Sequence, residues 1–178
     1  MLVLGIESTA HTFGIGLVKD GKIIFEKKEV YIPKEGGIHP REAAEHHARV
    51  AWKLIKEVEE KPDIIAYSAG PGLGPCLRIG TVIARYLGIK LKSPLVPVNH
   101  ATAHVEIGLE VTGAKDPVVV YVSGGNTLIL AYREGWKIFG ETLDIALGNA
   151  LDKLARKMGL GHPGGPKLEK LAEKAKKL

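Results

Sequence analysis

The sequence predicts an α/β fold in which a mixed sheet is flanked by helices, and two patterns support this prediction. In the first 31 residues, apolar positions alternate with small or polar ones, which is typical of half-buried strands. Beyond residue 40, short apolar runs alternate with longer segments whose apolar residues recur at helical spacing. The chain has 178 residues, 45% hydrophobic and 25% charged, so it is large enough to bury a core.

The first 31 residues predict three consecutive antiparallel strands, with a polar turn between the first and the second. This pattern resembles the opening of an actin-like ATPase domain, and the resemblance implies that the first turn points at the nucleotide phosphates. Glu7, Ser8 and His11 lie in this turn, and Glu7 is suited to hold a metal ion or a water molecule. A plain solvated turn has the same pattern. The predicted strands are residues 2–7, 13–18 and 23–31.

A helix is predicted from residue 41 to about residue 60, with His47 on its apolar face. A histidine in that position is more often a core residue than a ligand, so we expect His47 to be buried. His39, in the loop before the helix, is a candidate for substrate contact. A strand over residues 63–69, a Gly-Pro loop and a helix over residues 76–87 follow.

The central stretch begins with a short strand over residues 95–98 and continues into a helix that contains His100 and His104. Imidazoles four residues apart lie on one face of a helix and can share a metal ion. An apolar strand over residues 117–122 then leads into the turn Ser123-Gly-Gly-Asn126, whose backbone N–H groups suit an anionic ligand. An ordinary polar helix face and an ordinary hairpin turn remain the alternatives.

The last part of the chain predicts a hairpin, a helix capped by residues 141–144, a glycine-proline loop and a basic amphipathic helix. On the capped helix, Asp144, Gly148 and Asp152 are expected to share one face. The predicted ranges are 128–132 and 136–140 for the hairpin, 161–166 for the loop and 167–178 for the final helix.

Composition narrows the class of protein. No apolar run of about 18 residues is present and the amino terminus lacks the pattern of a signal peptide, so we expect a cytoplasmic protein without a membrane span. The single cysteine, Cys76, allows no intramolecular disulfide, and a small buried residue is as plausible there as a reactive thiol. A net charge of +5 permits nucleic-acid binding without indicating it, and the few aromatic residues argue against a base-stacking platform.

Six segments together resemble the universal tRNA threonylcarbamoyl transferase family, in the form of its archaeal and eukaryotic KEOPS branch, known earlier as O-sialoglycoprotein endopeptidase. They occur in the family's order and span the whole chain. They are Gly5–Thr12, Ser68–Gly74, Asn99–His104, Tyr121–Thr127, Asp144–Arg156 and Pro163–Pro166.

The resemblance implies an actin/Hsp70-like (ASKHA) fold of two lobes with the ligand between them. It implies transfer of a threonylcarbamoyl group from threonylcarbamoyl-AMP to N6 of the adenosine that follows the tRNA anticodon, with release of AMP. It also implies one divalent metal, iron or zinc, an adenylate nucleotide that is threonylcarbamoyl-AMP or ATP, and as partners tRNA and KEOPS subunits, among them a small protein kinase and a dimerisation subunit.

The resemblance also assigns residues, although it gives no catalytic residue. His100 and His104 correspond to the metal-binding histidines, with Tyr121 near the metal. The residues implied in substrate or nucleotide binding are Tyr121, Val122, Ser123, Gly124, Gly125, Asn126, Asp152, Gly165 and Glu169.

Family members are roughly twice this length, so we expect residues 1–178 to be the amino-terminal lobe, with the second lobe and its aspartate metal ligand absent. The isolated chain is then expected to be weakly active or inactive, to have an open metal site, and to self-associate through an exposed apolar face.

Three other functions fit parts of the pattern. A metalloprotease needs a glutamate directly after the first histidine, where this chain has Ala101. A sugar kinase or another ATPase of this fold has no need of His100 and His104. A non-catalytic nucleotide-binding or scaffold lobe has no need of a metal.

Overall fold

The computed structural model describes residues 1–33, 37–161 and 163–175. These residues form two compact units. The first unit consists of Met1–Lys34 and Ile38–Ala103, and the second consists chiefly of His104–Leu178. Whether residues 1–178 form one lobe therefore stays a prediction.

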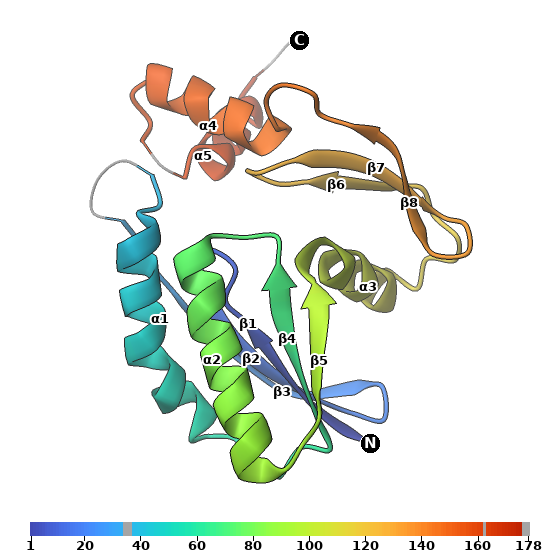
Figure 1. Ribbon diagram of the computed structural model, residues 1–178. Coiled ribbons are helices and arrows are strands. Elements are labelled where there is room, and N and C mark those ends of the chain that lie inside the picture. Colours follow the sequence, from blue (N-terminus) through green and yellow to red (C-terminus); the bar gives the residue numbers. More distant parts are fainter. Residues whose placement is uncertain (34–36, 162, 176–178) are drawn as a thin grey trace. The chain divides into compact units, whose positions relative to one another are not determined.

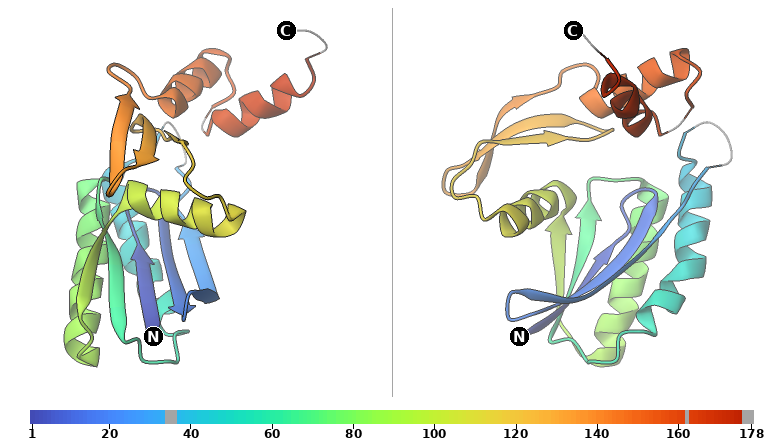
Figure 2. Two further views of the ribbon diagram at one scale, coloured as in Figure 1. Left: turned by 90° about the vertical axis from the view of Figure 1, so that its right-hand side faces the viewer. Right: turned by 180° about the vertical axis from the view of Figure 1, so that it is seen from behind.

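The first unit is a mixed sheet of five strands in the order β3-β2-β1-β4-β5 (Figure 1). β1 pairs antiparallel with β2 and β2 with β3, whereas β1 and β4, and β4 and β5, run parallel. Helices α1 and α2 cover one face of this sheet (Figure 2). The elements are β1 (Leu2–Glu7), β2 (Thr12–Lys19), β3 (Lys22–Val30), α1 (Pro40–Ile55), β4 (Ile64–Gly70), α2 (Gly74–Leu91) and β5 (Leu95–Asn99).

The core of the first unit follows the alternation of the amino-terminal strands. In β1, Leu2, Leu4 and Ile6 are buried and the residues between them are only partly covered. These side chains face the same core as Phe13 of β2 and Leu54 of α1. The expectation that His47 belongs to the core is confirmed, because its side chain is 0% exposed.

Two helices of the first unit differ from their predicted lengths, and so does the last helix, which spans Gly165–Ala172 rather than residues 167–178, of which 176–178 lie outside the described residues. α1 ends at Ile55 rather than near residue 60, because Lys56, Glu57 and Val58 form turn hydrogen bonds to residues three or four positions earlier. α2 extends beyond the predicted range at both ends. Pro75 is compatible with the first helical turn, where its missing N–H costs nothing, and Lys92 ends the helix in a left-handed conformation.

The second unit contains an antiparallel sheet in the order β6-β7-β8 and a small core around Val105, Leu128 and Leu130. Helix α3 begins in the first unit and continues into the second. The elements are α3 (His100–Thr112), β6 (Val119–Val122), β7 (Thr127–Tyr132), β8 (Trp136–Glu141), α4 (Leu147–Lys157) and α5 (Gly165–Ala172).

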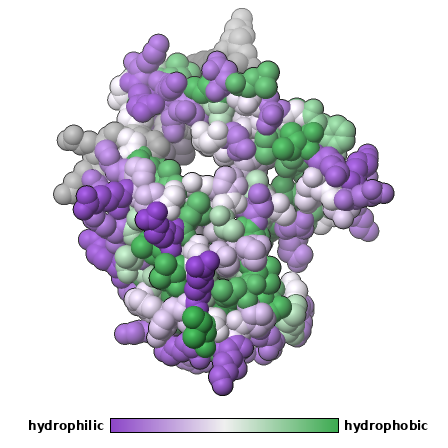
Figure 3. Space-filling view, viewed as in Figure 1, coloured by the Kyte–Doolittle hydropathy of each residue, from purple (hydrophilic) through white to green (hydrophobic). Residues whose placement is uncertain are grey.

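On the face that Figure 3 shows, hydrophobic and hydrophilic residues are intermixed. Among the helices that the structure describes, none combines the length and the apolar character that a membrane span requires.

The buried His47 predicts a pH-dependent stability. Its Nε2 lies 3.0 Å from the carbonyl oxygen of Ala10, and its Nδ1 is buried with no partner among the described residues. Desolvation lowers the pKa of His47 below its usual value of 6.5. The unfolded chain therefore binds more protons below pH 6.5, and the free energy of unfolding should fall as the pH drops through that value.

Urea unfolding at several pH values measures this effect. The fluorescence of Trp52 reports on the first unit once Trp136 of the second unit is replaced by phenylalanine. In His47→Gln, the free energy of unfolding should depend less steeply on pH below 6.5. If it fell equally steeply in the variant and in the unchanged chain, groups other than His47 would cause the pH dependence.

Candidate functional site

Three strands of the first unit run parallel, and their carboxyl ends meet at one edge of the sheet (Figure 1). β1 ends at Glu7, and β5 ends directly before His100. Ser68 lies near the end of β4 between them in the sheet order. Ligands of open α/β sheets bind outside the carboxyl ends of the strands, so this edge is the candidate site of the first unit.

The carboxylate of Glu7 connects three elements at this edge. Its Oε1 accepts hydrogen bonds from the backbone N–H of Thr9, at 2.7 Å, and from the Thr9 hydroxyl. Its Oε2 accepts a hydrogen bond from the Ser68 hydroxyl and lies 3.2 Å from Nδ1 of His100. Burial alone would favour the protonated acid, but the hydrogen bonds from His100, Ser68 and Thr9 outweigh it and lower the pKa of Glu7 to about 2.

The turn after β1 is held by close backbone contacts. The N–H of Leu73 donates to the carbonyl oxygen of Thr9 at 2.7 Å, and a Cβ on Gly72 would lie 2.6 Å from that oxygen. A Cβ on Gly80 of α2 would lie 1.9 Å from the hydroxyl oxygen of Ser8. The Ser8 hydroxyl is buried against α2 and has no partner among the described residues, so it does not face solvent as a substrate contact would.

Helix α3 begins at His100 because the side chain of Asn99 caps it. The Oδ1 of Asn99 accepts hydrogen bonds from the N–H groups of Ala101, at 2.9 Å, and Thr102, at 3.2 Å. The two histidines of α3 are four residues apart, which places them on one face of the helix. In the second unit, the ring of His104 lies 5.8 Å from that of Tyr121.

Two imidazoles suit a borderline metal such as zinc or iron. Within the described ranges, no group of three or more His, Cys, Asp and Glu side chains is arranged to hold a metal ion. The donors of α3 therefore fit part of a metal site, and a complete coordination sphere needs further ligands.

The turn between β6 and β7 differs from the expectation of freely donating amides. Ser123 Oγ accepts hydrogen bonds from the N–H groups of Gly125, at 3.2 Å, and Asn126, at 3.0 Å. The N–H of Ser123 itself donates to the carbonyl oxygen of Asn126. An anion bound at this turn would therefore compete with Ser123 Oγ for the N–H groups of Gly125 and Asn126.

The start of α4 corrects a prediction. The helix begins at Leu147, so Asp144 precedes it and does not share a helical face with Gly148 and Asp152. The N–H groups at the start of α4 are capped by residues of the β6–β7 hairpin rather than by residues 141–144. The N–H of Leu147 donates to Thr127 Oγ1 at 3.0 Å, and that of Gly148 donates to the carbonyl oxygen of Ser123 at 3.2 Å.

Asp152 organises the loop between α4 and α5. Its Oδ1 accepts a hydrogen bond from the N–H of Gly164 at 2.7 Å. A Cβ on Gly164 would lie 2.4 Å from that of Ala155, so the loop packs closely on α4. Gly165 is the first residue of α5, and Glu169 lies one turn further on and is exposed. Asp152 of α4 is thus hydrogen-bonded to the residue that directly precedes Gly165 and α5.

The remaining candidates are two histidines and the single cysteine. His11 and His39 are exposed, and the carbonyl oxygens of both accept backbone hydrogen bonds. Cys76 is buried, and burial raises the pKa of its thiol, so it is a packing residue rather than a reactive one.

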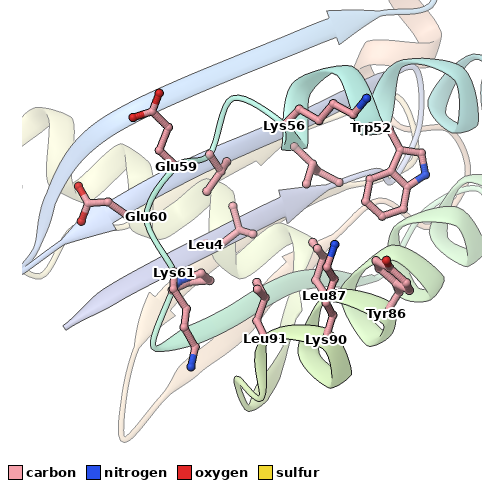
Figure 4. A pocket seen from close by; sticks show the side chains of 13 residues that line it. Leu4, Trp52, Lys56, Glu59, Glu60, Lys61, Tyr86, Leu87, Lys90 and Leu91 are labelled. Atoms are coloured by element: carbon pink, nitrogen blue, oxygen red, sulfur yellow. The ribbon is translucent and has the colours of Figure 1, made fainter.

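A groove of about 430 Å³ in the first unit lies at the opposite end of the sheet (Figure 4). Lys61 and Leu91, which line it, precede β4 and β5 and so mark the amino ends of these strands. Trp52 and Tyr86 contact each other edge to face beside it. It contains none of the candidate site residues.

Sequence reasoning missed Ser68, Thr9 and Thr127 as partners of the site. Ser68 is the first residue of one of the segments that carry the family resemblance, which was the available signal. Thr127 caps α4, which begins twenty residues later in the chain, and no local sequence pattern predicts that contact.

Ser123→Ala should loosen the turn, because the N–H groups of Gly125 and Asn126 lose their acceptor. We expect the second unit to lose about 0.5–1.5 kcal/mol of stability. Urea unfolding followed by Trp136 fluorescence, with Trp52 replaced by phenylalanine, measures this loss. Ser123→Thr keeps the hydroxyl and should retain most of the stability. Equal losses in both variants would contradict the role of the hydroxyl.

Comparison with known proteins places these features in a family. The family model described as tRNA N6-adenosine threonylcarbamoyltransferase matches residues 22–178. A protein of that name from Pyrobaculum islandicum is 58% identical over 98% of this chain and 55% of its own length. One from Archaeoglobus fulgidus is 55% identical over 99% of this chain and 57% of its own length. The chain spans about half the length of the curated relatives it matches.

Solved structures agree on the fold. EutJ, an ethanolamine utilization protein from Carboxydothermus hydrogenoformans, has a TM-score of 0.55 and 16% identity over 96% of this chain and 61% of its own. YeaZ from Pseudomonas aeruginosa has a TM-score of 0.54 and 16% identity over 79% of this chain and 65% of its own. Both likenesses confirm the predicted actin/Hsp70-like (ASKHA) fold class. The family model and the two curated relatives show that the chain belongs to the tRNA N6-adenosine threonylcarbamoyltransferase family.

Proposed function

We propose that the protein to which this chain belongs transfers a threonylcarbamoyl group from threonylcarbamoyl-AMP to N6 of the adenosine that follows the tRNA anticodon. The observation that carries this proposal is 58% identity, across nearly the whole chain, to a relative named tRNA N6-adenosine threonylcarbamoyltransferase. The contacts among Glu7, Ser68 and His100, at the ligand-binding edge of the sheet, support it.

His100 and His104 are the residues that would hold a divalent metal, zinc or iron, with Tyr121 as a further proposed metal contact that lies beside His104. Two imidazoles on consecutive helical turns and an aromatic ring 5.8 Å from His104 support this assignment. When bound, the metal would polarise or position the carbonyl group, whose oxygen gains negative charge during the attack. Because two histidines alone rarely hold a metal tightly, we expect the remaining ligand to come from outside residues 1–178.

The second unit supplies the proposed nucleotide contacts. The turn from Val122 to Asn126, with Tyr121 before it and both Gly124 and Gly125 within it, presents small residues to the adenylate phosphate. Asp152 accepts a hydrogen bond from Gly164, directly before Gly165 at the start of α5, and Glu169 of α5 offers a carboxylate to the ribose hydroxyls. The ligand is threonylcarbamoyl-AMP in the transfer reaction, and ATP is the other nucleotide that these contacts suit.

The chemistry needs orientation more than strong acid–base catalysis. The donor is a mixed anhydride, so attack by the adenosine amine on its carbonyl carbon forms the C–N bond and breaks the bond from that carbon to the phosphate oxygen. AMP leaves with the electron pair of the broken bond, and the proton of the amine passes to solvent. An exocyclic amine is a weak nucleophile, so holding its nitrogen above the carbonyl carbon contributes most to the rate. The net charge of +5 is compatible with tRNA as the acceptor.

A transfer assay tests this proposal with the complete enzyme that contains this chain. Threonylcarbamoyl-AMP and tRNA are mixed with the enzyme, and AMP release and modified adenosine are quantified together. We expect equal amounts of both products, and a large decrease after metal is removed by a chelator. AMP release without modified adenosine would show hydrolysis instead of transfer and would contradict the proposal.

The metalloprotease alternative is less well supported. Such a site places a glutamate beside the first histidine of the helix, and Ala101 occupies that position. A non-catalytic scaffold is the remaining alternative, and it predicts that the complete protein contains no stoichiometric metal.

The proposal extends to partners and location. The resemblance implies KEOPS subunits as partners, among them a small protein kinase and a dimerisation subunit, in the cytoplasm.

For the chain alone we expect self-association, because α2 carries exposed apolar side chains at Val82, Tyr86 and Ile89, and that of Ile89 is 82% exposed. Sedimentation equilibrium should show a dimer that Ile89→Glu dissociates. A monomer at all concentrations would contradict this.

A further inference from the structure

The side chain of Glu7 is saturated with hydrogen bonds. Its two oxygens accept hydrogen bonds from the Thr9 N–H, the Thr9 hydroxyl and the Ser68 hydroxyl, and Oε2 also lies 3.2 Å from His100 Nδ1. These groups come from the turn after β1, from β4 and from the start of α3. A carboxylate offers about four acceptor positions, so Glu7 has little capacity left for a metal ion or a water molecule. The sequence-based role of Glu7 as a holder of either is therefore poorly supported.

The same contacts define the state of the His100 ring. An ionised carboxylate only accepts hydrogen bonds, so the 3.2 Å contact requires the proton of neutral His100 to be on Nδ1. The lone pair of the imidazole is then on Nε2. A histidine that binds metal through one nitrogen usually donates its other N–H to a carboxylate or a carbonyl.

We infer that Glu7 is a positioning residue, which fixes His100 in the Nδ1–H tautomer and so presents Nε2 as the metal-binding nitrogen. Ser68 and Thr9 hold the Glu7 carboxylate in place for this task. The side chain of His100 is only 21% exposed, which further limits rotation of the ring. The metal part of this inference rests on the proposed function, whereas the tautomer part concerns the metal-free protein alone.

The first measurement needs no metal. Long-range ¹H–¹⁵N NMR of the histidine rings, assigned by comparison with His100→Ala, identifies which nitrogen carries the proton. We expect Nδ1–H in the unchanged chain near pH 8 and a shift toward Nε2–H in Glu7→Gln. A proton on Nε2 in the unchanged chain would overturn the inference, even if Glu7→Gln failed to fold.

Zinc affinity, measured by competition with a chromogenic chelator, is the second measurement. Glu7→Gln should weaken zinc binding by about 10–100-fold, the range found for partners behind metal ligands. Asp63→Asn is the matched control, because Asp63 also accepts a backbone N–H in this sheet, from Leu2 at 2.7 Å, but does not touch His100. It should leave both the tautomer and the zinc affinity unchanged.

The two measurements separate the failure of this inference from that of the proposed function. An Nδ1–H tautomer that depends on Glu7 in a chain that binds no zinc would support the positioning role and contradict the metal role of α3. An unchanged tautomer in Glu7→Gln, or an equal change in Asp63→Asn, would overturn the positioning role whatever the zinc affinity.

Discussion

Replacing both His100 and His104 by alanine is expected to remove zinc binding from this chain, with a loss of affinity of more than about 100-fold. The loss should exceed that of Glu7→Gln, because changing a partner behind a metal ligand costs only about 10–100-fold and the double variant removes both proposed ligands. Equilibrium dialysis with metal analysis measures both stoichiometry and affinity. In the complete enzyme, the same double variant should lose threonylcarbamoyl transfer to a similar or greater degree.

The matched control removes two other histidines. His11→Ala with His39→Ala changes exposed residues outside α3 and should leave zinc affinity unchanged. Circular dichroism establishes whether each variant remains folded. One bound zinc per chain in the double variant of His100 and His104 would contradict the assignment of the metal to α3.

Gly148→Ala is expected to have the largest effect on the second unit. A Cβ at this position would lie 2.6 Å from the carbonyl oxygen of Ser123 and 3.1 Å from the backbone nitrogen of Gly124. Both are backbone atoms, so either α4 or the turn must shift, and the bond from Gly148 N–H to Ser123 is lost. We expect a loss of about 1–3 kcal/mol of stability and weaker binding of adenine nucleotide.

Gly108→Ala provides the comparison within the same unit. Gly108 also lies in a helix, but a Cβ there would meet nothing within 4 Å. It should stabilise the unit by about 0.5–1 kcal/mol through helix propensity alone. Urea unfolding followed by Trp136 fluorescence measures both variants. Similar effects at the two positions would show that α4 does not pack against the turn as the structure has it.

Much of the fold was predictable from local pattern. The alternation in residues 2–7 and 13–18 determines which side chains are buried, and helical spacing placed His47 in the core. These predictions succeeded because burial of apolar side chains has the period of the secondary structure itself. The His100–His104 spacing likewise needed only a helix, and α3 confirms that helix.

The contacts between distant residues were not predictable from the sequence pattern. Glu7 meets Ser68 and His100 because three parallel strands end together, and the pairing order of strands is a tertiary property. The start of α4 was misplaced for a related reason. Residues 141–144 resemble a local cap, but Thr127 from the hairpin provides the actual one.

Calorimetric titration of AMP into this chain, with and without zinc, tests the central claim most directly. If the metal bound by α3 and the adenylate bound by the second unit take part in the same reaction, zinc should strengthen AMP binding in the unchanged chain. The double variant of His100 and His104 should lose this strengthening and keep the weak zinc-independent binding. AMP affinity that is the same with zinc, without zinc and in the double variant would contradict the account.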